Sequence, residues 1–189
     1  MRQSYASDGV VLRTRPLGEE SALLSILTSE LGLIHARAQG VKKMGAKLAG
    51  ALQTLSESEL TLVAGREGWR VRGAVPRTNW FSLLTPASRT RAARIAALLL
   101  RLVPADEKDA RHFTLLTAFM TALKETPEAA HEALECLMVL RTLEALGLET
   151  GDLPGDREAP FSIDTLRDVE RKRTAFVTRA NMGIAASGL

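Results

Sequence analysis

Ser21–Gly50 reads SALLSILTSELGLIHARAQGVKKMGAKLAG, and this stretch decides the fold. Apolar residues recur at every second position in Ser21–Ser29 and, more regularly, in Leu33–Gly40. A period of two predicts a β-strand in each segment, with one buried face and one solvent-exposed face. Between them lies Glu30–Gly32, and Gly32 supplies the positive φ that a short hairpin turn needs. The stretch therefore predicts an antiparallel hairpin.

The exposed face of this hairpin leads into a basic loop. Arg37 lies on that face, and Lys42, Lys43 and Lys47 follow between three glycines of the stretch. A cationic loop on a twisted sheet suits a phosphate backbone, because it supplies charge without requiring a particular base. We expect nucleic acid as the partner of this surface.

Three further segments alternate in the same way and predict strands at Asp8–Arg15, Leu55–Val63 and Trp69–Val75. In the first strand, Val11 is expected on one face with Arg13 and Arg15. In the last strand, the face of Trp69 is expected to carry Val71, Gly73 and Val75. Pro76 is expected to end this strand, because proline has no backbone N–H to donate. Five short antiparallel strands predict a small closed barrel. An OB-fold is one solution, and an SH3-like barrel satisfies the same periodicity.

From about Phe81 the pattern becomes helical. Helices are predicted at Pro86–Val103, Arg111–Lys124, Glu128–Leu146, with Thr126 as its cap, and Ser162–Phe176. The fold class is therefore α+β, with an N-terminal five-stranded OB-fold barrel in residues 1–80 and an all-α domain in residues 81–189.

The charge distribution separates these two parts. The whole chain carries +3, whereas residues 1–80 hold 11 Lys/Arg and 7 Asp/Glu, and the remainder holds 14 and 15. A positive first domain favours an anionic partner, and a nearly neutral second domain favours a protein partner or a scaffold role.

We find no sequence motif that would bring catalytic residues together. Cys136 is the only cysteine, which excludes a cysteine zinc cluster and favours a buried, unreactive thiol. His35, His112 and His131 have no partner at metal-binding spacing and are expected at the surface or at helix starts. The loop GVKKMGAKL lacks the hydroxyl residue of a Walker motif. The sequence predicts no enzyme, no metal and no cofactor.

No apolar stretch has the length of a membrane span or of a signal peptide, the longest apolar run being Ile95–Leu100. We therefore expect a cytoplasmic protein without a membrane partner.

The basic residues of the predicted barrel form the candidate DNA-binding set: Arg37, Lys42, Lys43, Lys47, Arg13, Arg15, Arg70 and Arg72. Aromatic residues make up only 4% of the chain. Those in or near the barrel are Tyr5, Trp69, Trp80 and Phe81, and Trp69 is expected in the core. Base stacking should therefore contribute less to binding than electrostatics.

The order of these parts resembles the N-terminal domain of RecO-type recombination mediator proteins. The family's glycine-led first strand, its P-x-G-E turn, its A-x-G-x-K/R-K/R loop and its Q-containing segment are matched by Gly9–Leu12, Pro16–Glu19, Ala38–Lys43 and Ala51–Gln53. Farther on, Leu134–Pro154 is similar to the family's helix end L-R-x-L-x-x-L-G-x-x-P. The likeness is weak after Gly155.

The resemblance implies an OB-fold followed by a helical domain, and binding of single- and double-stranded DNA. It also implies strand annealing and a partnership with RecR and single-stranded-DNA-binding protein, at the nucleoid. Many family members carry a four-cysteine zinc site after the L-G-x-x-P helix end. That region is shortened here and has no cysteine, so we expect a short form without zinc. An adaptor of the repair machinery with weak or no DNA binding remains the alternative.

Overall fold

The computed structural model describes residues 3–39, 46–156 and 159–188. The chain divides into two compact units. The first comprises residues 1–83 and 104–113, and the second comprises residues 84–103 and 114–189. The division between residues 80 and 81, as a boundary between independently folding domains, stays a prediction.

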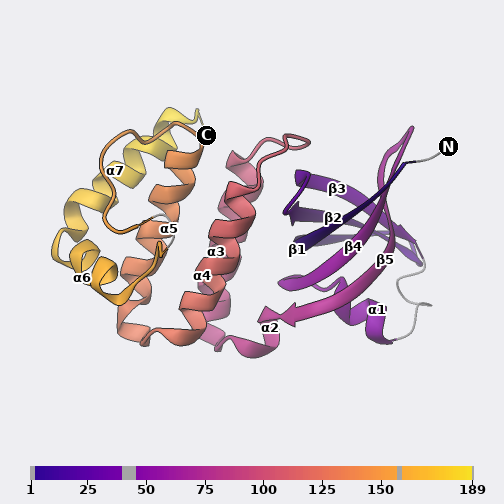
Figure 1. Cartoon of the computed structure of the whole chain (residues 1–189), viewed down its shortest axis with the longest axis horizontal. Helices are drawn as coiled ribbons and strands as arrows, with labels where there is room; N and C mark the ends of the chain where they lie inside the picture. The colour runs from indigo at the N-terminus through magenta and orange to yellow at the C-terminus, as the bar shows by residue number, and fades with distance from the viewer. Residues whose placement is uncertain (1–2, 40–45, 157–158, 189) are drawn as a thin grey trace. The chain divides into compact units, whose positions relative to one another are not determined.

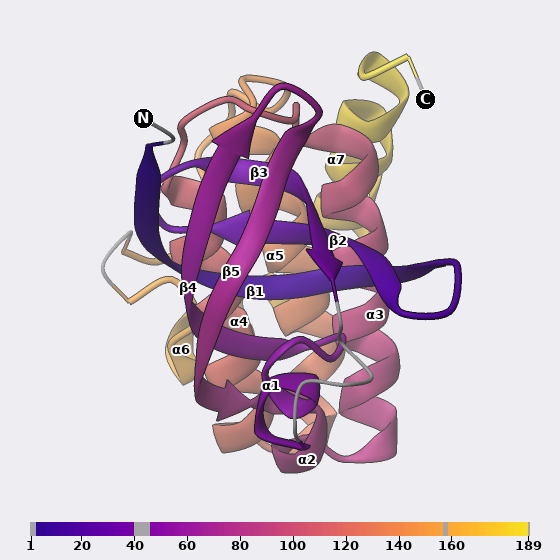
Figure 2. The same cartoon turned by 90° about the vertical axis from the view of Figure 1, so that its right-hand side faces the viewer.

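The first unit is a closed five-stranded barrel (Figures 1 and 2). Its strands are β1 Ser4–Leu17, β2 Ser21–Thr28, β3 Gly32–Gln39, β4 Ser56–Gly65 and β5 Gly68–Asn79. They lie in the order β1-β2-β3-β5-β4, and β1 pairs with both β2 and β4. All pairs are antiparallel except β3 with β5. The predicted OB-fold is confirmed, and the SH3-like alternative is not needed.

The barrel interior is filled by the apolar residues of the predicted alternation. In β3 the buried residues Ile34, Ala36 and Ala38 face the core, and His35 and Arg37 are exposed, as the period of two requires. Gly9 of β1 faces the same interior, where a Cβ would lie 2.8 Å from Ile26 Cγ2. The core cluster consists of Val11, Ala22, Leu24, Ile26, Leu31, Ile34, Ala36, Ala38, Leu52, Leu60 and Leu62.

A β-bulge in β1 corrects the predicted face of Val11. Val11 pairs with Ile26 and joins the core, but the next paired residue is Arg13, opposite Ser25. The extra residue, Leu12, switches the alternation, so that Val11 lies inside the barrel and Arg13 lies outside. The expectation that Val11 shares a face with the two arginines is wrong.

Two bulges in β5 correct the predicted end of this strand. Thr61 of β4 pairs with Gly73 and Leu62 pairs with Val71, which leaves Arg72 as the extra residue. Beyond it Ala74 packs on the core and Val75 is 58% exposed, so Val75 does not share the face of Trp69. Pro76 lies within β5 at the next irregularity of the register, where a missing donor is tolerated, and the strand continues to Asn79.

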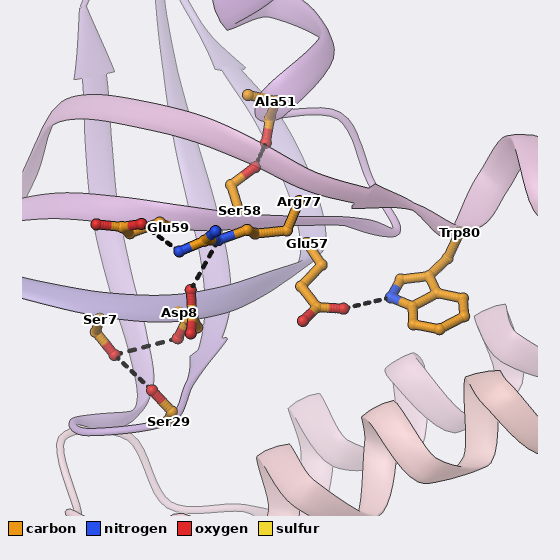
Figure 3. A network of polar contacts seen from close by, with 9 residues as sticks. All are labelled: Ser7, Asp8, Ser29, Ala51, Glu57, Ser58, Glu59, Arg77 and Trp80. Carbon is orange, nitrogen blue, oxygen red and sulfur yellow. Dashed lines mark hydrogen bonds and ion pairs between the residues drawn. The ribbon is translucent and has the colours of Figure 1, made fainter.

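The connection between β3 and β4, predicted as a loop, contains helix α1 Ala46–Ala51. The hydroxyl of Ser58 in β4 donates to the carbonyl of Ala51 at 2.8 Å and holds the end of this helix, while Leu52 enters the core (Figure 3). After β5 comes the short helix α2 Trp80–Leu83. Its buried Trp80 donates from Nε1 to Glu57 at 2.8 Å.

The second unit is helical, as predicted. It is built from α3 Pro86–Leu102, α4 Arg111–Glu125, the 3-10 turn η1 Glu128–Ala130, α5 His131–Ala145, α6 Ile163–Arg171 and α7 Arg173–Ala186. The first three residues of α4 count with the barrel unit. Thr85 caps α3, with Pro86 in its first turn, and Ser162 caps α6.

Two details of the predicted helices are wrong. Ser162–Phe176 is not one helix, because α6 ends before Lys172, whose φ is −111°, and α7 continues to Ala186. Thr126 is not a cap, since its hydroxyl donates back to the carbonyl of Ala122 at 2.7 Å. In the described chain no helix is both long and apolar enough to cross a membrane.

Helix α5 is the centre of the second unit and contacts α3, α6 and α7. Its buried residues lie on most of its circumference and include Arg141, which is only 4% exposed. The guanidinium of Arg141 donates to the carbonyl oxygens of Pro154 and Asp156 at 2.9 and 3.3 Å. Arg141 therefore fixes the loop after α5, and burial of its charge is offset by these hydrogen bonds.

His112 and His131, expected at the surface or in capping positions at helix starts, do lie at the starts of α4 and α5, but both are buried. His131 is 3% exposed and lies with Nε2 3.1 Å from the carbonyl oxygen of Thr126. His112 is 1% exposed, and neither of its ring nitrogens has a hydrogen-bond partner among the described residues. Burial lowers the pKa of His112, and the Asp109 carboxylate, 3.6 Å from Nδ1, opposes this only in part. Sequence position at a helix start did not reveal this burial.

Residues 104–113 return to the barrel and bind the turn between β2 and β3. The amide of Asp106 donates to the carbonyl of Leu33 at 2.8 Å, and Trp69 Nε1 donates to the Asp106 carboxylate at 3.0 Å. Gly32 has a φ of +69°, and a Cβ there would lie 1.9 Å from the carbonyl oxygen of Glu107. The turn therefore admits only glycine, for both its φ and its close approach.

Replacing Gly32 by alanine should destabilise the barrel by more than the left-handed backbone alone costs, about 1–2 kcal/mol. The added methyl group must also displace the Glu107 carbonyl. Gly18→Ala is the matched control, because its φ is +75° and a Cβ there meets no atom within 4 Å. Both tryptophans, Trp69 and Trp80, belong to the barrel unit, so urea unfolding followed by tryptophan fluorescence reports on it. Equal losses in the two variants would contradict the contact with Glu107.

Protonation of His112 should weaken the fold at mildly acidic pH. Its folded pKa lies below the ordinary value of 6.5, so the unfolded chain binds more protons as the pH falls below that value. The free energy of unfolding should therefore fall between about pH 7 and pH 5, and less steeply in His112→Leu. The pKa of Asp109 is also lowered, chiefly by its hydrogen bond with Arg111. The stability that ionised Asp109 contributes is lost only below about pH 4, outside this range. Superimposable pH profiles would count against the buried imidazole.

Candidate nucleic-acid interface

The outer face of the barrel is apolar and buried at one end and polar and exposed at the other. Leu27 and Leu33 pair across β2 and β3 at the buried end, each with at most 2% exposure. Two residues along each strand, Ser25 pairs with His35, and their Oγ and Nδ1 atoms are 3.1 Å apart. Beyond them lies Arg37. Ser25 is still buried, whereas His35 and Arg37 are exposed, so period-two alternation along β3 gives this face an exposed, polar half.

A row of paired residues crosses four strands of this half. Arg15 of β1 is opposite Leu23 of β2, Leu23 is opposite Arg37 of β3, and Arg37 is opposite Arg70 of β5. Because paired residues project to the same side of a sheet, these three arginines share the outer face. Neighbouring strands lie about 4.8 Å apart, so the row spans about 14 Å.

Two more arginines flank this row. Arg13 pairs with Ser25 and is exposed, since the bulge at Leu12 turned it outward. Arg72 is the exposed extra residue of the bulge in β5. We call the set Arg13, Arg15, Arg37, Arg70 and Arg72 the arginine face. Figure 2 shows the β1–β2 hairpin, which carries two of these arginines, reaching beyond the other strands.

The predicted lysines are placed less completely. Lys42 and Lys43 lie outside the described residues, and Lys47 belongs to α1. In the sequence, Lys42 and Lys43 follow closely after β3, whose exposed residues include Arg37 and Gln39. The five arginines of the predicted set are therefore the part whose positions are described.

A carboxylate lies within the arginine face. Glu67, in the turn between β4 and β5, accepts from Arg37 Nη1 at 3.3 Å and from Arg70 Nη2 at 3.2 Å. The three side chains are 62%, 49% and 34% exposed, respectively. Exposed ion pairs of this kind contribute about 0–1 kcal/mol, so Glu67 holds both guanidinium groups only weakly.

Another part of the barrel surface carries negative charge. Asp8 of β1 pairs with Glu59 of β4, and the guanidinium of Arg77 bridges them, 2.5 Å from Glu59 and 3.8 Å from Asp8 (Figure 3). Nearby, the hydroxyls of Ser7 and Ser29 are 3.2 Å apart. A groove of about 470 Å³ lies here, lined by acidic and basic side chains together. The charges of this groove largely cancel, whereas the five arginines of the arginine face outnumber their paired carboxylate, Glu67.

The aromatic residues offer little surface for base stacking. Trp80 is buried, and Trp69 packs on the core with its ring edge-on to Tyr5 at 5.3 Å between centroids. The expectation that Trp69 lies with the core is confirmed. Of the candidates near the barrel, Phe81 is 49% exposed.

No convergent catalytic or metal site is found in the part of the chain that the structure describes. Three or more His, Cys, Asp or Glu residues do not gather there in a way that could hold a metal ion. Cys136, half-buried in a groove of about 330 Å³ in the helical unit, has its pKa raised by burial, which keeps the thiol protonated at neutral pH. The arrangement of the barrel favours binding of anions over covalent chemistry.

Sequence reasoning did not single out Glu67 and Arg77, which form ion pairs on the barrel surface. The pairing of Glu67 with Arg37 and Arg70 depends on β5 lying beside β3, which no local sequence pattern shows. Arg77 was hidden by the expectation that the strand ends at Pro76. For His35 and Gln39 the signal was present, since both alternate with the buried residues of β3.

Known proteins with related sequences were identified. Residues 1–76 match the family model described as "Recombination protein O N terminal". A protein named DNA repair protein RecO from Heliobacterium modesticaldum is 35% identical over 144 residues, which cover 76% of this chain and 51% of that protein. The proteins of the same name from Cyanothece sp. and Roseiflexus sp. are 30% and 31% identical, over 78% and 76% of this chain and 51% and 50% of their own lengths.

The chain thus spans about half the length of the curated relatives that it matches. The family match covers the five strands up to Pro76, and the similarity to the RecO protein from Heliobacterium modesticaldum, over 144 residues, extends into the helical unit. Together with the order of strands in the barrel, these matches show that residues 1–76 form an N-terminal domain of the RecO family and that the chain is similar to DNA repair proteins RecO.

Proposed function

We propose that this chain is a non-enzymatic DNA-binding mediator of recombinational repair, which holds single- and double-stranded DNA by the phosphate backbone on its arginine face. The observation that carries the proposal is the row Arg15, Arg37 and Arg70, aligned by strand pairing on one exposed side of an OB-fold. The names of its relatives, DNA repair protein RecO, support the repair role.

Guanidinium groups suit this task because each presents a planar fork of donors that matches two oxygens of a phosphate. The row runs across the strands, so a bound backbone would cross β1, β2, β3 and β5 in turn. With Trp80 buried and Trp69 packed on the core, few rings are available to read or stack bases. Binding should therefore depend on charge and little on base sequence.

Partners and activities of the mediator are part of the same proposal. The resemblance to the family supports strand annealing, recombinase loading with RecR and single-stranded-DNA-binding protein, and a place in the cytoplasm at the nucleoid. The helical unit around α5 supplies further surface for such partners. Since the chain spans about half the length of its relatives, each of these activities needs its own measurement on this chain.

A second function is favoured by one observation. Glu67 already pairs with Arg37 and Arg70, and Asp8 and Glu59 add negative charge elsewhere on the barrel. A barrel whose cations are largely compensated would be an adaptor of the repair machinery with weak or no DNA binding. The salt dependence of DNA binding separates the two functions.

DNA affinity should fall steeply with salt. About three to five phosphate contacts on a single strand give a log–log slope of about −2 to −4, and Arg15→Gln/Arg37→Gln/Arg70→Gln should weaken binding and reduce that slope by about 2. Titration of labelled mixed, dT and dA oligonucleotides and of a duplex, by fluorescence anisotropy at several salt concentrations, measures both quantities. A flat salt response, or one base sequence preferred by orders of magnitude, would favour the adaptor.

Reversing the charges of Lys42, Lys43 and Lys47 to glutamate should also weaken DNA binding, because these cations follow the arginine face directly along the chain. The matched control reverses Arg101, Lys124 and Lys172, exposed cations of the helical unit, and changes the net charge equally. We expect a loss of at least about tenfold in the loop variant and a smaller loss in the control. Unchanged affinity with normal thermal stability would remove the lysines from the interface.

A further inference from the structure

We propose that Glu67 acts as an internal competitor for DNA phosphate, its carboxylate occupying the position between Arg37 and Arg70 that a phosphate group takes in the complex. This inference rests on the proposed function, because it requires the arginine face to bind DNA. It assigns to the turn between β4 and β5 the control of affinity at that face.

The geometry that supports this is a carboxylate shared by two guanidinium groups. Glu67 Oε2 accepts from Arg37 Nη1 at 3.3 Å and from Arg70 Nη2 at 3.2 Å. Arg37 and Arg70 are directly paired across the parallel strands β3 and β5. A phosphate oxygen is a negatively charged acceptor like the carboxylate oxygen, so a DNA phosphate that binds Arg37 Nη1 and Arg70 Nη2 together takes the place of Glu67.

The carboxylate is held loosely enough to be displaced. Its side chain is 62% exposed and makes no other hydrogen bond or ion pair among the described residues. Glu67 lies in a two-residue turn between Gly65 and Gly68, which are paired as the last residues of the hairpin. A change of side-chain rotamer therefore exposes both arginines without any change in the barrel, and the carboxylate competes with phosphate through charge alone.

The position of Glu67 also distinguishes it from the other carboxylates on the barrel. Glu59 is similarly exposed and likewise pairs with an arginine, Arg77, but its strand neighbours are Asp8 and Val75 and not the arginine face. Both variants, Glu67→Gln and Glu59→Gln, remove one negative charge and keep the size of the side chain. Glu67→Gln releases two arginines of the proposed DNA site, whereas Glu59→Gln releases Arg77, which lies outside it.

The test measures binding of a labelled dT oligonucleotide to the full chain by fluorescence anisotropy at several salt concentrations. Glu67→Gln should tighten binding about 3- to 10-fold at low salt, which corresponds to about 0.7–1.4 kcal/mol. The salt slope should also steepen by about 0.7, as for one additional phosphate contact on a single strand. Glu59→Gln should change the affinity by less than about twofold.

The same substitution is then made in Arg37→Gln/Arg70→Gln, where Glu67→Gln should have no effect. The inference is supported if Glu67→Gln binds the oligonucleotide more tightly and this gain in affinity disappears in the Arg37→Gln/Arg70→Gln background. Equal gains in Glu67→Gln and Glu59→Gln would overturn it in favour of net charge. If Glu67→Gln leaves the DNA affinity unchanged while Arg37→Gln/Arg70→Gln weakens it, the inference is overturned and the proposed function stands. If loss of the two arginines changes nothing, the DNA site at this face fails and the inference fails with it.

Discussion

The structure of the barrel depends on the parallel pairing of β3 with β5. These strands are separated by α1 and β4 in the chain, yet Ala36, Arg37 and Ala38 lie opposite Trp69, Arg70 and Val71. The pairing closes the sheet, so that neither strand leaves an unpaired edge. It places Trp69 against the core and Arg70 beside Arg37. The interior of the fold and its cationic exterior thus result from one set of backbone hydrogen bonds.

Bulges determine which side chains reach that exterior. The extra residue Leu12 places Arg13 on the outer face of the barrel, and the extra residue Arg72 places Val75 on that face as well. Without them, strict alternation would place Arg13 with Val11 inside an apolar barrel, where an unpaired charge is very costly. The bulges therefore reconcile a closed hydrophobic core with a charged outer surface, and they bend the strands as closure requires.

The helical unit is organised around a different constraint, the burial of α5. A helix enclosed on most sides must satisfy every polar group that it carries. Arg141 does so by donating to the carbonyls of Pro154 and Asp156, which orders the loop after the helix. In this chain a buried guanidinium fixes the backbone there, and no metal ligand set is found among the described residues.

The sequence by itself determined the local elements. Alternation located the five strands and Gly32 marked the hairpin turn, because each signal lies within a few residues of the element it specifies. Only the tertiary structure decided the pairing of β3 with β5, the position of Glu67 between two arginines and the burial of His112. These depend on contacts between segments distant in the chain. No local pattern encodes which strands become neighbours or where a bulge shifts their register.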